Sequence, residues 1–424
     1  MGGNLPATQH LVHASNATIS EATRNGPLRR GSTPLCCDIR IPFTNLRVPA
    51  VLMRYDRVCI ESFGYELPEE LVSSEEIEQR LAPLYDRLRL PAGRLELITG
   101  IRERRFWPKG MLPSEKSIAS GQRAIAAAAI KPSDIGALVH GSVCRDHLEP
   151  ATACRVHHGL GLADECVVYD VSNACLGLLN GIVQVANMIE LRQIRAGLVV
   201  GTEGSRERVE NTIDHLNHET TLTRNQLKRA IASLTIGSAS CAVLLVDREL
   251  SRSGNRLTSA AVRTNTEHHQ LCHSGRDEAV SDGMTPLMDT DSETLMHAGI
   301  ETGREAFSRF LKTSGWQRAD IDKTFCHQVG ITHRNLMFEQ MGLNTRLDFT
   351  TVETLGNTGS VALPVTMAIG IEEGWLSAKD RVALMGIGSG INTVMLGVEW
   401  QTAPVKMGLV SAKSPSIVSP VAST

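Results

Sequence analysis

The sequence predicts an α/β protein, because short strand-like runs alternate with helical segments along most of its 424 residues. The order strand, polar turn, buried helix, strand occurs twice, once around Cys175 and once around Asn357. Hydrophobic residues make up 42% of the chain, which is enough to build the core of one large layered unit or of two to three average domains. We therefore expect layers of helices packed on a sheet, with the polar turns meeting at one edge of it.

The individual elements follow from hydrophobic periodicity and from the residues that begin and end helices and strands. Helices are predicted at 68–81, 83–90, 113–130, 154–163, 175–189, 296–311, 331–341 and in the buried segment that ends at 371. Strands are predicted from 54 onward and at 135–143, 166–171, 196–201, 234–247, 259–264, 322–330, 347–352 and 381–385. We expect 97–107 to be a basic loop and 205–232 to be a polar surface excursion.

Composition divides the chain into four parts. Residues 1–53 mix Asn, Thr, Ser, Gly, Pro and Arg without sustained periodicity, and 402–424 are rich in Ser, Pro, Ala and Val. We expect a disordered extension at the first and a mobile tail at the second. Residues 54–248 and 249–401 are predicted to form an N-terminal and a C-terminal half. Their element order is alike, although two ordinary strand–helix units can also match by chance.

Charge and cysteine usage exclude several classes of function. The net charge of −3 gives no reason to expect a nucleic acid or an acidic membrane surface as a partner. The ten cysteines form neither a CxxC pair nor a Cys/His zinc pattern, so no zinc site or disulfide framework is predicted. No stretch reaches the roughly 18 unbroken apolar residues of a membrane span, and no apolar signal-peptide core is present at the N-terminus. These features favour a protein of the reducing cytoplasm.

Cys175 is the first candidate nucleophile. The strand predicted at 166–171 leads through Ser-Asn-Ala into a helix that is apolar on nearly every face. We expect Cys175 on the first turn of that helix, where unpaired backbone N–H groups and the helix dipole favour a thiolate. The alternative is a buried structural cysteine. A nucleophilic role also needs a base and an oxyanion site from elsewhere in the chain.

His327 and Asn357 are the candidates for these additional roles. Both follow predicted strands, and both lie in short segments rich in glycine or small residues. A single histidine among fourteen is usually structural, and an asparagine between glycines is commonly a turn residue. Together with Cys175 they indicate a catalytic group, because an imidazole can exchange a proton with the thiol. An imidazole N–H and an amide can also bind a thioester carbonyl as it becomes an enolate.

The segment 97–107 is basic and carries two aromatic residues. Arg104 and Arg105 are candidates for binding the phosphates of a nucleotide-like ligand, and Trp107 is a candidate for stacking on a ring of that ligand. An equal alternative is a solvated run of charge that two aromatic side chains anchor.

At these motifs the sequence resembles the thiolase superfamily, specifically its β-ketoacyl synthase III branch, from about residue 54 to 401. Ser-Asn-Ala-Cys175-Leu-Gly is similar to the nucleophile motif of that family, His327-Gln-Val-Gly to its histidine motif, and Gly-Asn357-Thr-Gly-Ser to its asparagine motif. The resemblance implies a five-layered αβαβα fold of two duplicated halves and an obligate homodimer. It also implies thioesters of coenzyme A or acyl carrier protein as substrates, Cys175 as the acylated nucleophile, and His327 with Asn357 as the pair that polarises the donor thioester.

Two further residues gain roles from the resemblance. Gly-Ser389-Gly is similar to the family's glycine-rich loop, which implies an oxyanion hole made by the backbone N–H groups of Ser389 and Cys175. Degradative thiolases place a second cysteine near this loop, where this chain has none. The segment Leu-Glu149-Pro-Ala-Thr-Ala resembles a motif of OleA-type head-to-head condensing enzymes, whose glutamate removes an α-proton in the neighbouring subunit's active site. Without that match, Glu149 is read as a carboxylate of a surface loop.

The resemblance as a whole implies a non-decarboxylative Claisen condensation. Cys175 takes a first long-chain acyl group from its CoA, Glu149 deprotonates a second acyl-CoA, and a 2-alkyl-3-ketoacyl-CoA forms without a metal or redox cofactor. Other enzymes of a lipid pathway are the implied partners. Two alternatives stay open. One is a decarboxylating 3-oxoacyl-ACP synthase III, or a related acyltransferase, that uses malonyl-ACP; the other is a non-catalytic acyl-binding subunit.

Overall fold

The computed structural model describes residues 53–275 and 288–407, which belong to one compact unit. The extension predicted at 1–53 lies outside the described residues except for Met53, and the greater part of the tail predicted at 402–424 lies outside them too. Within that predicted tail, Val405–Met407 form a strand that pairs in parallel with the first long strand of the fold. This short segment is therefore part of the folded unit.

Strands and helices alternate through the described residues as the sequence predicts. The strands are β1 (Met53–Arg54), β2 (Val58–Glu66), β3 (Glu70–Ser73), β4 (Glu103–Phe106), β5 (Ala137–Gly141), β6 (Val167–Val171), β7 (Ala196–Glu203), β8 (Ala239–Asp247), β9 (Arg256–Thr264), β10 (Cys272–Ser274), β11 (Met288–Thr290), β12 (Lys323–Cys326), β13 (Arg381–Gly388), β14 (Asn392–Glu399) and β15 (Val405–Met407). The α-helices are α1 (Ser74–Arg80), α2 (Ala82–Leu88), α3 (Arg94–Thr99), α4 (Pro113–Ala128), α5 (Thr152–Leu160), α6 (Gly177–Glu190), α7 (Arg206–His218), α8 (Arg224–Leu234), α9 (Ser292–Ser314), α10 (Ile331–Met341), α11 (Val352–Leu355) and α12 (Ala362–Glu372). Of the helices described, none is long and apolar enough to cross a membrane.

The main sheet repeats one arrangement of strands twice. Its order is β12-β13-β14-β9-β2-β8-β7-β5-β6, with β1 beside β9 and β15 beside β2. Because β2 and β9 share only the pair Cys59 and Arg256, the sheet is nearly divided there into two parts. In one part the parallel pair β5 and β7 continues into antiparallel β8 and β2. In the other part the parallel pair β12 and β13 continues into antiparallel β14 and β9, which confirms the two duplicated halves.

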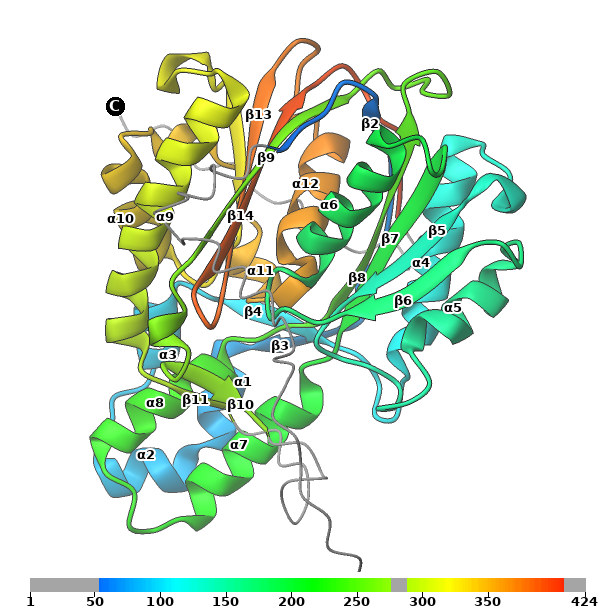
Figure 1. Cartoon of the computed structure of the whole chain (residues 1–424). Coiled ribbons are helices and arrows are strands. Elements are labelled where there is room, and N and C mark those ends of the chain that lie inside the picture. The colour runs from blue at the N-terminus through cyan, green and yellow to red at the C-terminus, as the bar shows by residue number, and fades with distance from the viewer. Residues whose placement is uncertain (1–52, 276–287, 408–424) are drawn as a thin grey trace, which may run out of the picture. The chain divides into compact units, whose positions relative to one another are not determined.

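Helices form three layers around the two parts of the sheet (Figure 1). The central layer is α6 and α12, and α12 contacts strands of both parts. On the outer face of the first part lie α4 and α5, which contact β2, β7, β8, β5 and β6. On the outer face of the second part lies α9, which contacts β9 and β14 and is itself packed against α10. The order helix, sheet, helix, sheet, helix confirms the predicted five-layered αβαβα fold.

The strands between these layers are apolar on both faces. Successive side chains of a strand point to opposite sides of the sheet. In β5 and β7, Val139 and Val199 pack in the central core around α6 and α12, whereas their neighbours Leu138 and Leu198 pack against α4 and α5. This double burial explains why the strands appear in the sequence as nearly continuous apolar runs.

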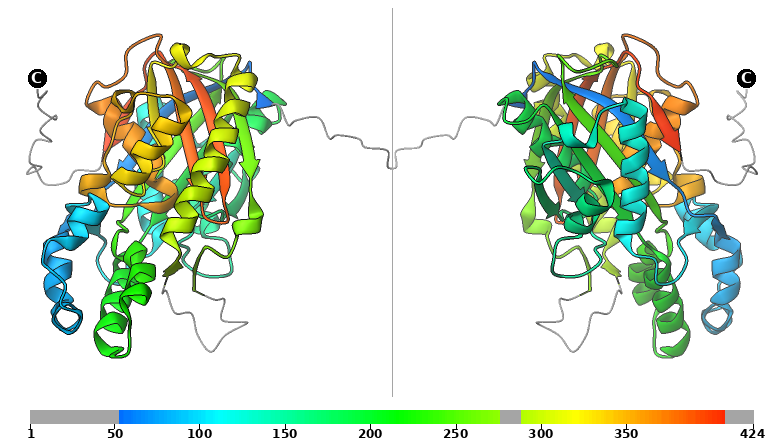
Figure 2. Two further views of the ribbon diagram at one scale, coloured as in Figure 1. Left: turned by 90° about the vertical axis from the view of Figure 1, so that its left-hand side faces the viewer. Right: turned by 90° about the vertical axis from the view of Figure 1, so that its right-hand side faces the viewer.

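A smaller hydrophobic cluster lies at one end of the sheet, where α1, α2, α3, α7, α8 and the β3–β4 pair meet (Figures 1 and 2). The prediction of a polar surface segment at 205–232 is wrong, because these residues form the helices α7 and α8. Val209, Ile213 and Leu216 of α7 are buried in the cluster. Polar and charged residues fill the other faces of both helices, which weakens the apolar periodicity of the segment.

The strand predicted at 347–352 is also wrong. It is reduced to a single bridge between Asp348 and Thr324 of β12, after which the chain turns into α11. The buried Asp348 carboxylate accepts hydrogen bonds from the Thr324 hydroxyl and the Arg334 guanidinium. In the first half, the corresponding segment is β6, which forms a full ladder with β5. Beside β12, side-chain hydrogen bonds to Asp348 take the place of that ladder.

Candidate active site

Cys175 lies on a sharp turn between β6 and α6. Ala174 has a φ of +45°, in the left-handed region that costs a non-glycine residue about 1 kcal/mol or more. The helix begins at Gly177, so Cys175 precedes it and is not on its first turn as predicted. A Cβ added to Gly177 would lie 2.8 Å from the backbone carbon of Gly141 at the end of β5. Close packing therefore fixes the start of α6 against the end of β5.

The Cys175 thiol is protonated at rest. Burial raises its pKa to about 12, and the negative charge of Glu203 adds to the effect of burial. The prediction that the helix start favours a thiolate is therefore wrong. Attack on a thioester requires a base that accepts the proton as the sulfur–carbon bond forms.

His327 follows β12, and its backbone N–H donates to the Met385 carbonyl of β13 at 3.0 Å. Its side chain is buried, and neither ring nitrogen has a hydrogen-bond partner among the residues that the structure describes. Burial lowers the pKa of His327 to about 3, and neighbouring His333 lowers it further. His327 is therefore a neutral imidazole that has one nitrogen to accept a proton and one N–H to donate.

The segment that carries His327 is anchored to the buried Asp348. The Arg334 Nε of α10 donates to this carboxylate at 2.7 Å, and the Cys326 thiol lies 3.1 Å from it. Gln328 accepts hydrogen bonds from the backbone N–H groups of Thr351 and Val352, which connects the histidine segment to α11. No pattern in the sequence indicates this network, because its members are 14 to 24 residues apart in the chain.

We predict that Arg334→Ala lowers the free energy of unfolding by about 3 kcal/mol, because it leaves the Asp348 carboxylate buried without its cation. Burial already raises the pKa of Asp348, and loss of Arg334 should raise it further. The loss of stability should therefore grow as the pH rises through that pKa. Urea unfolding at two pH values measures it. The exposed Arg346→Ala is the matched control, and equal losses in both variants would contradict the prediction.

Asn357 is held by its backbone, and its side-chain orientation is fixed. Its N–H donates to the Thr235 carbonyl and its carbonyl accepts from the Gly237 N–H, both at 2.9 Å. Its side-chain Oδ1 accepts from the Gly359 N–H at 3.0 Å. The Nδ2 group is thereby left as the donor of this side chain, which suits binding of a carbonyl oxygen.

Strand β13 brings the Cys175 and His327 segments together. A Cβ added to Gly388, at the end of β13, would lie 3.4 Å from the Cys175 nitrogen. His327 is bonded to Met385 in the same strand, and Ser389 begins the turn that follows it. The Cys175 turn, the His327 segment and the Ser389 turn thus meet at the same ends of parallel strands, where ligands of α/β sheets bind.

Glu203, at the end of β7, links the Asn357 turn to this group. A Cβ added to Gly359 would lie 3.1 Å from the Glu203 Cγ, and the charge of Glu203 acts on Cys175. Glu203 is a functional candidate that no sequence pattern indicates, because a polar residue before glycine is typical of an ordinary strand end. Trp107 lies against the same residue. It is buried, and its Nε1 donates to the Glu203 carbonyl at 3.1 Å, so Trp107 supports the site and does not offer a ring face to a ligand.

Glu149 lies apart from these residues within the chain. It is exposed, in the segment between β5 and α5. The end of this segment is fixed to β6, because the backbone N–H groups of Thr152 and Ala153 donate to the Asp170 carboxylate at 2.8 Å. The segment of Glu149 therefore ends, three residues later, beside β6, the edge strand of the sheet.

Arg104 and Arg105 are engaged within the protein. The Arg104 side chain is fully buried and donates to the Ser74 hydroxyl at 3.0 Å and to the Leu234 carbonyl at 3.1 Å. Arg105 donates to the Pro68 carbonyl at 2.7 Å. Burial lowers the pKa of both, that of Arg104 to about 10. The prediction that Arg104 binds the phosphates of a ligand is wrong, because its position in the β3–β4 pair shields it from any ligand.

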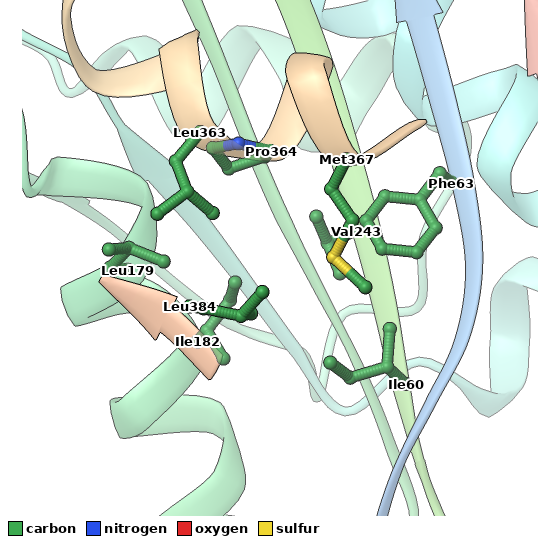
Figure 3. A pocket seen from close by; sticks show the side chains of 9 residues that line it. All are labelled: Ile60, Phe63, Leu179, Ile182, Val243, Leu363, Pro364, Met367 and Leu384. Atoms are coloured by element: carbon green, nitrogen blue, oxygen red, sulfur yellow. The ribbon is translucent and has the colours of Figure 1, made fainter. Parts of the chain in front are cut away.

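A small apolar cavity lies between α6, α12 and the inner faces of the strands (Figure 3). Its lining side chains are Ile60, Phe63, Leu179, Ile182, Val243, Leu363, Pro364, Met367 and Leu384. Its free volume of about 10 Å³ corresponds to one water molecule, so the central core is nearly filled. Packing of α6 and α12 in this common core keeps the Cys175 and Asn357 turns, which precede these helices, in fixed positions.

Comparison with known proteins adds independent evidence. The chain matches a model described as the N-terminal domain of thiolase over residues 112–244, and one described as the 3-oxoacyl-[acyl-carrier-protein] synthase III C terminal over 311–400. An acyl-CoA:acyl-CoA alkyltransferase of Shewanella oneidensis is 42% identical over 351 residues, which is 82% of this chain and all of that protein. One of Xanthomonas campestris pv. campestris is 31% identical over 348 residues with the same coverage.

Solved structures of Xanthomonas campestris OleA share the fold at 31% identity. A cysteine-to-serine variant with bound lauric acid and lauroyl-CoA matches with a TM-score of 0.77, over 82% of this chain and 100% of that one. A glutamate-to-alanine variant matches with a TM-score of 0.78 over the same shares. The glutamate and the cysteine replaced in these variants stand the same number of residues apart as Glu149 and Cys175.

Proposed function

The chain belongs to the acyl-CoA:acyl-CoA alkyltransferase family of the thiolase superfamily, and from this we infer that it joins two acyl-CoA molecules head to head. The product of this non-decarboxylative Claisen condensation is a 2-alkyl-3-ketoacyl-CoA. The observation that carries the inference is the 42% identity to the Shewanella alkyltransferase along its whole length. The arrangement of Cys175, His327 and Asn357 at one end of the parallel strands supports it.

In the first half-reaction Cys175 attacks the carbonyl carbon of an acyl-CoA. The thiol proton passes to the neutral His327 as the sulfur–carbon bond forms, because the pKa of about 12 leaves little thiolate beforehand. The backbone N–H groups of Cys175 and Ser389 stabilise the oxyanion. CoA leaves with the proton from His327, and an acyl-cysteine remains.

In the second half-reaction Glu149 removes an α-proton from a second acyl-CoA. The His327 N–H and the Asn357 Nδ2 bind the enolate oxygen, each donor contributing about 3 kcal/mol. The α-carbon attacks the acyl-cysteine, the Cys175 sulfur leaves, and the proton taken by Glu149 restores the thiol. Every step is a polar step between these groups and the two thioesters, so the proposed reaction requires no metal or redox cofactor.

We propose that the active protein is a homodimer joined along β6. This strand pairs with β5 on one side and has no partner strand on the other among the described residues. Two apolar side chains at this edge, Val167 and Leu148, are 45% and 49% exposed. Unpaired edges are usually covered in soluble proteins. Because the segment of Glu149 ends beside β6, pairing of two such edges would carry Glu149 toward the partner's active site.

The product has to be consumed by another enzyme, since a 3-keto thioester is reactive. We propose a role in a lipid pathway such as olefin biosynthesis. The cysteines of the described residues are all free, which fits a place in the reducing cytoplasm.

We predict that purified protein given long-chain acyl-CoA alone releases CoA over many turnovers and forms a 2-alkyl-3-ketoacyl-CoA. A thiol assay measures the CoA, and mass spectrometry identifies the condensed acid or the ketone derived from it after alkaline hydrolysis. The control adds malonyl-ACP. If CoA release stops at one equivalent per site until the malonyl donor is present, the decarboxylating alternative is correct. Absence of any acyl-cysteine would support a non-catalytic subunit.

A further inference from the structure

Glu203 is a buried carboxylate that the reaction steps above do not use. Its side chain accepts hydrogen bonds on both oxygens. The backbone N–H groups of Val143 and Cys144 donate at 3.0 and 3.3 Å, and the Ser360 hydroxyl donates at 2.6 Å. Val143 and Cys144 begin the segment that leads to Glu149, whereas Ser360 belongs to the turn of Asn357. One carboxylate thus joins two segments that carry proposed catalytic groups.

The charge of Glu203 also acts on the nucleophile. After burial, it is the largest influence that raises the pKa of Cys175. Two other groups act on this thiol: Cys272 of β10 raises its pKa, and Arg208 of α7 lowers it. The Ser389 turn, which also contacts the Cys175 segment, contributes no charged side chain.

Two titratable groups besides Cys175 are influenced by Glu203. Burial raises the pKa of Cys144 to about 12, and the charge of Glu203 adds to this. Burial lowers the pKa of His140 in β5, and the charges of Asp170 and Glu203 oppose this effect. Both are therefore neutral near pH 7.

We propose that Glu203 is a positioning residue, whose carboxylate holds the Glu149 segment against the Asn357 turn. The charge of this carboxylate also favours the thiol form of Cys175 over the thiolate. This proposal rests on the function inferred above. The carboxylate is 6% exposed and accepts hydrogen bonds from both segments, so we expect it to act through these neighbours. A protonated resting thiol is also protected from oxidation, because oxidants react with the thiolate.

The charge is tested by alkylation of Cys175 with iodoacetamide, without any acyl-CoA. Glu203→Gln keeps the size of the side chain and removes the charge. We expect the alkylation rate of the Cys175 peptide at pH 9, followed by mass spectrometry, to rise about three- to tenfold, because a larger thiolate fraction outweighs a slightly weaker nucleophile. Ser360→Ala removes one hydrogen bond and leaves the charge, so its alkylation rate should match the wild type.

The positioning role is tested by Glu203→Asp, which keeps the charge but shortens the side chain by one methylene group. We expect an unchanged alkylation rate together with a condensation kcat about 10- to 100-fold lower, since the two loops lose their common anchor. Equal alkylation rates in Glu203→Gln and wild type would overturn the electrostatic role, as would the same rise in Ser360→Ala. Unchanged kcat in Glu203→Asp would overturn the positioning role. Alkylation needs no acyl-CoA, so failure of the proposed condensation would appear only in the product assay.

Discussion

Replacing Cys175 with alanine is expected to abolish acylation and to reduce condensation by a factor on the order of 10⁴ or more. Cys175 is the proposed attachment point of the acyl group, so any residual rate would come from the oxyanion donors. Intact mass spectrometry after incubation with acyl-CoA measures the adduct, and the thiol assay measures CoA release. Wild-type protein should gain one acyl group per chain.

The matched control for this variant is Cys272→Ala. Cys272 is the other thiol that acts on Cys175, and it is partly exposed. We expect this control to keep both the adduct and the condensation. If Cys175→Ala still gained the acyl adduct, or if Cys272→Ala lost it, the prediction that Cys175 is the nucleophile would be wrong.

The sequence located the cysteine but not its protonation state, and magnitudes explain why. A helix N-terminus contributes about 0.3–1 kcal/mol to an anion, which is less than one unit of pKa. Burial of the sulfur shifts the pKa by several units in the opposite direction. Burial depends on α6 and on the ends of β5 and β13, which are distant in the chain, so it is visible only in the structure.

The fold was predictable because its halves repeat and because its strands are buried on both faces. The turns of Cys175 and His327 were predictable because each follows a strand, β6 and β12. The turn of Asn357 was predictable from the glycines around it, although it follows α11 and not the strand that the sequence suggested. Glu203 and Asp348 were not, since their partners are backbone N–H groups and an arginine from separate elements. Arg104 shows the converse error. Its charge suggested a ligand, whereas pairing of β3 with β4 places it fully inside the protein.

Glu149→Gln is expected to acylate at a rate near wild type and to condense about 10³-fold more slowly, because only the second half-reaction needs a base for the α-proton. A burst of one CoA per site should therefore persist, while product formation nearly stops. Rapid-quench measurement of both signals separates the two half-reactions. Glu165→Gln, which also removes one exposed carboxylate, is the control and should behave as wild type.

Mixing the two inactive proteins tests whether Glu149 acts across the dimer. A mixed dimer of Cys175→Ala and Glu149→Gln chains contains one site that has both an intact Cys175 and, from the other chain, an intact Glu149. Random exchange of equal amounts should restore about one quarter of the wild-type activity, since half of the dimers are mixed and each has one competent site. If Glu149 served the cysteine of its own chain, no site in any mixed dimer would be complete. The mixture would then stay inactive, and the position of the Glu149 segment beside the β6 edge would need a different explanation.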